Sequence, residues 1–171
     1  MRLGESFFRR DVLEVAPALV GAYVCRRLPD GNLLRSRITE TEAYRGEEDL
    51  ACHARFGKTR RNAVMYLPGG HAYVYLVYGL HWLFNVIAGE EGAPQGVLIR
   101  ALAPPLDGPA KWTKAFQITG AHNGLYLPHS DEIWLEQGDA YPLRSAPRVG
   151  IDYAPEPWKS KPWRFIMERE I

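Results

Sequence analysis

Residues 71–87 read HAYVYLVYGLHWLFNVI, which is the clearest hairpin pattern in the chain. Both halves are rich in β-branched and aromatic residues, which favour strands. We predict arms at His71–Val77 and Leu80–Ile87, joined by a two-residue turn at Tyr78–Gly79. Turns usually take small polar residues, so the large ring of Tyr78 should be exposed. An exposed aromatic on a rigid tip suits a wedge for a base stack, and packing against a neighbouring loop is the alternative.

Two helices are predicted on either side of the hairpin in the sequence. The first opens at Asp11, which together with Glu14 resembles a capping box, and it ends before Gly21. The second covers Gly108–Ile118. The residues that share one face of the first helix are Val12, Val15, Ala16 and Leu19, and those of the second are Trp112, Ala115 and Phe116.

The remaining apolar segments predict short strands bounded by turn residues. The class is therefore α+β, a single domain over residues 1–171 with a mostly antiparallel, curved and barrel-like sheet and peripheral helices. The predicted strands outside the hairpin are Tyr23–Leu28, Leu33–Tyr44, Gly96–Leu102, Ile133–Leu135, Val149–Ile151 and Arg164–Met167.

Composition excludes several classes of protein. With 171 residues, 46% hydrophobic and 24% charged, the chain is an ordinary globular sequence. Its apolar runs are too short for a membrane helix, and its first residues lack the apolar stretch of a signal peptide, so a cytoplasmic protein is expected. Two cysteines predict neither a disulfide framework nor a zinc site, and the five histidines lack paired ligand spacing, so no metal is expected. A net charge of +1 argues against a generally basic nucleic-acid surface.

The acidic strand is the first candidate for chemistry. Residues 37–44 read RITETEAY, and the period of a strand places Glu40, Glu42 and Tyr44 on one face. Such a face is either exposed to solvent or lines a polar cleft. The spacing alone does not distinguish Glu40 from Glu42 as the functional acid.

A polar segment over residues 47–62, predicted as a loop with a helical turn, follows that strand. It contains His53, which taken alone is more typical of a surface or structural residue than of a catalytic one. Its basic residues form either a charged loop or an edge that binds strand phosphates. They are Arg55, Lys58, Arg60 and Arg61, the densest basic cluster of the chain.

In their order along the chain, these segments resemble the alkyladenine (3-methyladenine) DNA glycosylases of the mammalian type. The resemblance covers roughly residues 7–167. It is carried by RITETEAY (37–44), ACH (51–53), Arg61-Asn62 with Met65, YVYLVYG (73–79), Asn85, VLIRAL (97–102), GPAK (108–111) and RVG (148–150).

The resemblance implies a role for each matching residue. Glu42 would be the general base for an attacking water, and Arg100 and the backbone of Val149 would help to hold that water. Asn85 would disfavour the exocyclic amine of normal guanine, and Tyr78 would fill the gap that a flipped base leaves in the duplex. Tyr44, His53 and Tyr75 would line the base pocket, and Arg55, Lys58, Arg60, Arg61 and Met65 would contact DNA.

The implied activity is hydrolysis of the N-glycosidic bond of alkylated or deaminated purines in double-stranded DNA, without a cofactor. The acidic strand has no lysine that could form a Schiff base, so no lyase step is expected. The resemblance also implies a monomer, bound to the nucleoid in a bacterium. The segment 103–107 is shorter than in longer members, which puts nonspecific DNA affinity in doubt, and His81 and Trp82 alter the predicted hairpin.

Two other functions remain open at this stage. A non-catalytic nucleic-acid-binding domain would have a similar scaffold, but binding alone does not require the Glu42 and Arg100 pair. A hydrolase of free nucleosides would need neither the wedge at Tyr78 nor the basic cluster.

Overall fold

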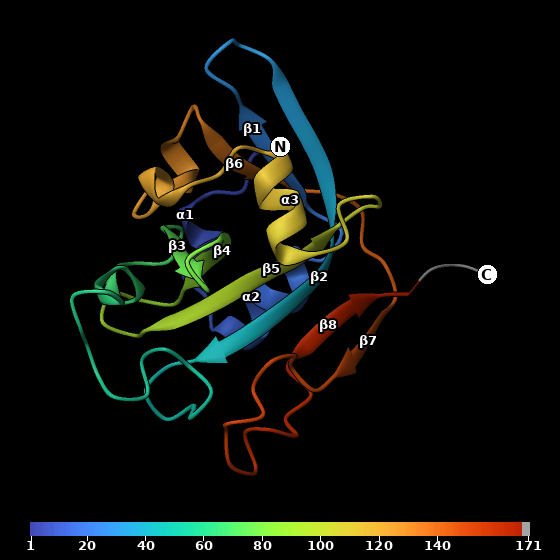
Figure 1. The fold of residues 1–171 in the computed structure, drawn as a ribbon. Helices are drawn as coiled ribbons and strands as arrows, with labels where there is room; N and C mark the ends of the chain where they lie inside the picture. Colours follow the sequence, from blue (N-terminus) through green and yellow to red (C-terminus); the bar gives the residue numbers. More distant parts are fainter. Residues whose placement is uncertain (169–171) are drawn as a thin grey trace.

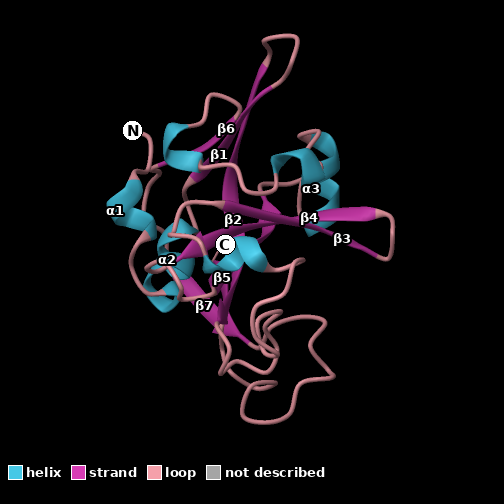
Figure 2. Cartoon of the chain, turned by 90° about the vertical axis from the view of Figure 1, so that its left-hand side faces the viewer, coloured by secondary structure: helices cyan, strands magenta, loops and turns pink. Residues whose placement is uncertain are grey.

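The computed structural model describes residues 1–168, and an antiparallel sheet of eight strands forms the framework of that part (Figure 1). The strand order is β3-β4-β5-β2-β1-β6, with β8 paired to β2 and β7 paired to β8. The sheet curls, so that β1 and the adjoining part of β2 extend in one direction and the hairpin of β3 and β4 extends in another (Figure 2). The predicted class is therefore confirmed. The strands are β1 (Tyr23–Arg27), β2 (Leu33–Arg45), β3 (Ala72–Val77), β4 (His81–Ala88), β5 (Gln95–Leu102), β6 (Ile133–Glu136), β7 (Leu143–Ala146) and β8 (Arg164–Met167).

The helices are short and pack on one face of the sheet. Asp11 caps α2 by accepting a hydrogen bond from Leu13 N at 2.9 Å, and the predicted apolar face of that helix is buried. In α3, Trp112 is buried and its indole N–H donates to Ile99 O at 2.9 Å, whereas Ala115 is exposed. The helices are α1 (Glu5–Phe8), α2 (Val12–Leu19) and α3 (Pro109–Ala115), with 3-10 helices η1 (Ala63–Tyr66), η2 (Gly120–His122) and η3 (Leu127–His129).

The predicted hairpin is formed by β3 and β4 and projects from the body of the molecule (Figure 2). Its turn has three residues rather than the predicted two, because Val77 pairs with His81. Tyr78 and Gly79 both have positive φ angles, 53° and 66°, and only glycine adopts such angles without strain. Tyr78 is 89% exposed at this tip.

The two faces of the sheet have different roles. One face is apolar, and α2 packs there on β2 and β5 while α3 packs on β4 and β5. Thr41 lies on this face and satisfies its hydroxyl by donating to Ala16 O at 2.8 Å. The core contributed by the strands on this face includes Val74, Phe84, Val86, Val97 and Ile99.

The opposite face carries a row of side chains across five strands. The strand register aligns Tyr73 with Asn85, Asn85 with Leu98, Leu98 with Glu42, and Glu42 with Arg164. These residues alternate with the core residues of their strands, so they project away from α2 and α3. The folding of the sheet thus brings together residues that are far apart in the sequence.

The strand predicted at Val149–Ile151 is wrong. This segment is part of a loop, because Gly150 has a φ of 75° and Val149 N donates to a side chain rather than to a neighbouring strand. Residues 47–62 form loops and turns, and the 3-10 helix η1 begins just after them. Within residues 1–168, no helix is long and apolar enough to cross a membrane.

The turn at Pro68-Gly69-Gly70 gives a test of the packing. A Cβ atom on Gly69 would overlap the carbonyl of Phe8, whereas open space surrounds Gly4. We expect Gly69→Ala to lower the free energy of unfolding by about 1–3 kcal/mol, the usual cost of overpacking. Urea denaturation measures the change. Gly4→Ala is the control and should cost less than about 1 kcal/mol; equal effects of the two would contradict the close approach.

Candidate active site

The Glu42 carboxylate is fully buried and is held from three directions. Tyr44 Oη donates to Oε1 at 2.9 Å, and the backbone N–H of Val149 donates to Oε2 at 2.7 Å. Arg100 forms an ion pair through Nε, 2.9 Å from Oε2, and its Nη2 lies 3.4 Å from Oε1. β2, β5 and the loop after β7 each supply one of these partners. Three donors of this kind stabilise the charged form of a buried carboxyl.

A cavity of about 290 Å³ lies against this cluster. Tyr44, Arg100 and Val149 line it, so the partners of Glu42 form the wall between the carboxylate and the cavity. Burial and the nearby Glu42 carboxylate raise the pKa of Tyr44 well above its usual value, so its hydroxyl remains a donor. The aromatic and imidazole lining consists of Tyr44, His53, Tyr73, Tyr75, Tyr78 and Tyr153.

His53 faces the cavity from the loop that follows β2. Its Nδ1 lies 3.0 Å from Tyr73 Oη, and its ring centroid lies 4.5 Å from that of Tyr75. Burial, with the positive charges of Arg61 and Arg55, lowers the pKa of His53 to about 4. The ring is therefore neutral at pH 7. Burial likewise raises the pKa of Tyr73 to about 12, so the partner of His53 is also uncharged.

Asn85 and Met65 form another part of the cavity wall. Asn85 is buried, and its Nδ2 donates to Tyr73 O at 3.2 Å. Met65 was predicted to contact DNA, but only 3% of it is exposed. It packs with Cys52 and Ile87 and lines the cavity, so the structure places it in the pocket wall and not on the surface.

The basic cluster follows His53 in the loop after β2. Lys58, Arg60 and Arg61 are exposed, as a phosphate-binding edge requires. Arg55 is held between two aromatic rings, with its guanidinium 4.7 Å from the centroid of Phe56 and 5.0 Å from that of Tyr153. No pattern in the sequence indicated that two exposed rings lie beside this guanidinium.

Glu40 lies on the same face as Glu42, as predicted, but in a different environment. Its carboxylate is 4.0 Å from Arg100 Nε and 3.5 Å from Arg164 Nη1, and its side chain is 19% exposed, whereas that of Glu42 is fully buried. The Trp82 ring packs against the apolar core on the other face of the sheet, beside Gly120. It therefore does not alter the cavity.

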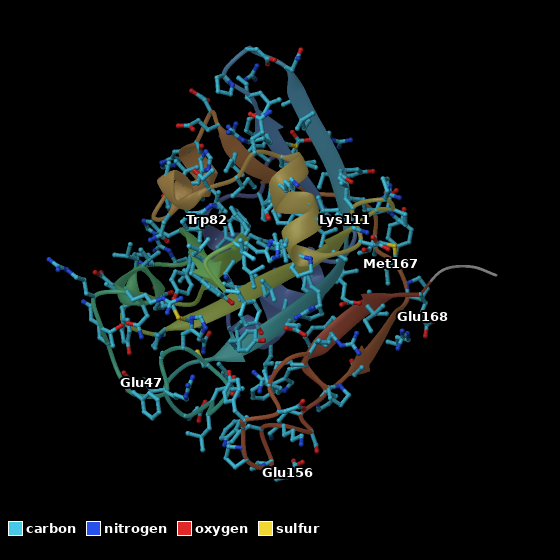
Figure 3. The ribbon with its side chains drawn as sticks, viewed as in Figure 1. Glu47, Trp82, Lys111, Glu156, Met167 and Glu168 are labelled. Carbon is cyan, nitrogen blue, oxygen red and sulfur yellow. The ribbon has the colours of Figure 1, made fainter. Side chains whose placement is uncertain are left out.

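Two residues at the base of the site were missed by the sequence reasoning. Asp49 and Arg148 form an ion pair that is completely buried, with N–O distances of 2.6 and 3.0 Å. It joins the loop after β2 to the loop after β7, which lie at one end of the molecule, where Figure 3 labels Glu47 and Glu156. The RVG segment pointed to this region, but the aspartate gave no separate signal.

The profile of the methylpurine-DNA glycosylase family matches residues 6–171, almost the entire chain. The chain belongs to the methylpurine-DNA glycosylase family. This agrees with the segments that carry the resemblance in the sequence, several of which meet at the cavity.

Relatives of this glycosylase are found in bacteria and archaea. A presumed 3-methyladenine DNA glycosylase of an Anaeromyxobacter species is 45% identical over 98% of this chain and 90% of its own length. Those of Methanocella arvoryzae and Natranaerobius thermophilus, named in the same way, are 42% and 40% identical. They cover 95% and 98% of this chain and 90% and 96% of their own lengths. The narrower mammalian type stays a prediction.

The environment of His53 predicts a low titration midpoint. In an NMR titration we expect its ring protons to report a pKa of about 4. Arg61→Gln should move this midpoint toward 6.5, because it removes one of the positive charges that oppose protonation. Arg60→Gln, at the exposed neighbouring arginine, is the matched control and should leave the midpoint near 4.

The same shift predicts how stability depends on pH. In the unfolded chain His53 titrates near 6.5, so between pH 6.5 and about 4 the unfolded state binds more protons than the folded state. The contribution of His53 to stability is thus complete above pH 6.5 and is lost as the pH falls toward 4. Urea denaturation across this range should show a shallower pH dependence in His53→Gln; an unchanged slope would count against the assignment.

Proposed function

We propose that this glycosylase flips damaged purines out of duplex DNA and hydrolyses their N-glycosidic bond, with Glu42 as the general base. The observation that carries the proposal is the Glu42 carboxylate, held by Tyr44, Arg100 and Val149 behind an aromatic cavity. The substrates proposed are purines of the 3-methyladenine, 7-methylguanine, hypoxanthine and ethenoadenine class.

The cavity suits an electron-poor purine. Alkylation at a ring nitrogen makes the base cationic, and the faces of Tyr44 and Tyr75 attract a cation. His53 is neutral at pH 7, so it adds no repulsive charge. When Tyr73 donates to its Nδ1, the proton of His53 is on Nε2, which can then donate to an acceptor atom of the base. The Asn85 side chain at the base of the cavity limits which exocyclic groups fit.

The proposed step is hydrolytic and balances without a cofactor. A water oxygen bonds to C1′ of the deoxyribose while its proton passes to Glu42, and the C1′–N bond breaks with its electron pair going to the base. A cationic base then leaves as a neutral molecule, so no general acid is needed, whereas a neutral lesion such as hypoxanthine leaves as an anion and takes up a proton from water. The proton on Glu42 returns to solvent. Arg100 lines the cavity beside the carboxylate and would orient the water.

The surroundings of the cavity suit a duplex substrate. Tyr78 at the hairpin tip would occupy the space of the extruded base, which offsets part of the unstacking cost. The exposed Lys58, Arg60 and Arg61 would contact phosphates beside the cavity. No lysine is present among the described residues that line the cavity, which favours a hydrolase without a lyase step. A monomer in the cytoplasm, bound to the nucleoid, fits this activity.

The proposal predicts different effects at the two glutamates. Glu42→Gln should lower the single-turnover rate of base release at least about 100-fold, because a general base contributes about that much or more. Labelled duplexes with one hypoxanthine or ethenoadenine, and methylated genomic DNA, provide the substrates. Glu40→Gln is the matched control on the same strand and should keep most of the activity.

The opposite outcome at either glutamate would reassign the base. If Glu40→Gln loses activity and Glu42→Gln keeps it, Glu40 is the base. If the wild type binds duplex DNA and releases no base from any of these substrates, the protein is a binding module.

The exposed tyrosine gives a second prediction. Tyr78→Ala should slow base release from duplex DNA by about 10-fold or more, because nothing then fills the gap in the stack. The free energy of unfolding should change by less than about 0.5 kcal/mol, since the ring is in solvent. Leu80→Ala is the control, because Leu80 lies in the same turn and is 75% exposed. Equal rates for the two variants would exclude a wedge at Tyr78.

A further inference from the structure

The backbone amide that contacts Glu42 belongs to Val149, which lies in an exposed loop and not in a strand. Val149 is 45% exposed, lies outside the strands, and is followed by Gly150 with a φ of 75°. Its N–H nevertheless lies 2.7 Å from Glu42 Oε2. Something else must fix this amide, since loops of this kind are usually mobile.

The neighbouring side chain supplies the anchor. Arg148 directly precedes Val149, and its side chain is fully buried. Its Nη1 and Nη2 donate to the two carboxylate oxygens of Asp49 at 2.6 and 3.0 Å, a bidentate arrangement. The guanidinium also donates to two backbone carbonyls, Ala43 O at 3.0 Å and Trp158 O at 3.2 Å. It lies over the rings of Tyr44 and Trp163 as well, 4.8 and 5.1 Å from their centroids.

Asp49 is tied to the backbone as firmly as its partner. Its Oδ2 accepts from Arg45 N at 2.9 Å and its Oδ1 from Ala51 N at 3.0 Å. The ion pair therefore joins three segments: β2, the loop after β2, and the loop after β7. These segments carry Glu42, His53 and the Val149 amide respectively.

We propose that Arg148 and Asp49 are positioning residues for the reaction, which hold the Val149 N–H on the Glu42 carboxylate. The inference rests on the proposed function. Neither side chain lines the cavity, so both act through the groups that they hold. Breaking a buried pair leaves an uncompensated charge, so the loops move to let water in. A displacement of about 1 Å at a reacting group can cost about 100-fold in rate.

The loss of this donor separates the chemical step from DNA binding. Neither Arg148 nor Asp49 lines the cavity, and neither belongs to the exposed basic cluster, so the affinity for duplex DNA should not change. A displaced Val149 N–H would therefore lower the single-turnover rate at saturating protein, while the dissociation constant for duplex DNA keeps its wild-type value. A general loss of folded structure would weaken DNA binding as well.

The test compares Arg148→Lys and Asp49→Asn with Arg26→Lys. Arg26 is the matched control because it is also buried and donates to backbone carbonyls, those of Phe116, Gln117 and Arg27, away from the cavity. Three quantities are measured for each protein: hydrogen exchange of the Val149 amide by NMR, the dissociation constant for duplex DNA, and the single-turnover rate of base release at saturating protein.

We expect both site variants to expose the Val149 amide to exchange at least about 10-fold faster, to lose about 10- to 100-fold in rate and to keep the wild-type dissociation constant for duplex DNA. Arg26→Lys should keep the wild-type exchange, rate and dissociation constant. Should Arg148→Lys not fold, Asp49→Asn decides, because it changes only one side-chain atom.

Unchanged exchange of the Val149 amide in both site variants, or a rate loss that is matched by a weaker affinity for duplex DNA, would overturn the proposal. If the wild type releases no base, the proposed function fails, and the exchange measurement still decides whether the pair holds the amide.

Discussion

The interaction on which the rest of the site depends is the compensation of a buried carboxylate. Removing an ionised carboxyl group from water costs several kcal/mol unless other groups replace its hydration. Glu42 obtains those groups from its own strand, from β5 and from the loop after β7. β2, β5 and the loop after β7 must all be correctly placed before the charge of Glu42 is compensated, so the burial of this one residue constrains much of the fold.

Much of the framework could be predicted from residues 23–45 and 71–102, because period-two alternation and turn residues are local signals. The shared face of Glu40, Glu42 and Tyr44 followed from the same period. The third residue of the hairpin turn could not be predicted, since a turn that is one residue longer leaves the apolar and aromatic pattern of the two arms unchanged. The segment at Val149 resembled a strand because it is β-branched, but its amide bonds to a side chain 107 positions away.

The site itself was accessible mainly through the family resemblance. Composition and spacing gave candidate acids and a basic cluster, but not the choice of Glu42 over Glu40, which depends on burial. Asp49 looked like one more residue of the acidic stretch 47–49, and its partner lies 99 positions further on. Met65 was predicted to contact DNA although it is buried, because no local pattern in the sequence shows that Cys52 and Ile87 cover its side chain.

The row from Tyr73 to Arg164 has a consequence for how the protein matures. Side chains alternate between faces, so a slip of one residue along β2 would place Thr41 in the cavity and Glu42 against α2. A sheet with that slip does not form a partly correct cavity, because it buries an unpaired acid in the hydrophobic interior and is disfavoured. Newly made chains with a misaligned β2 would therefore lack the Glu42 cluster, which forms only together with the native sheet.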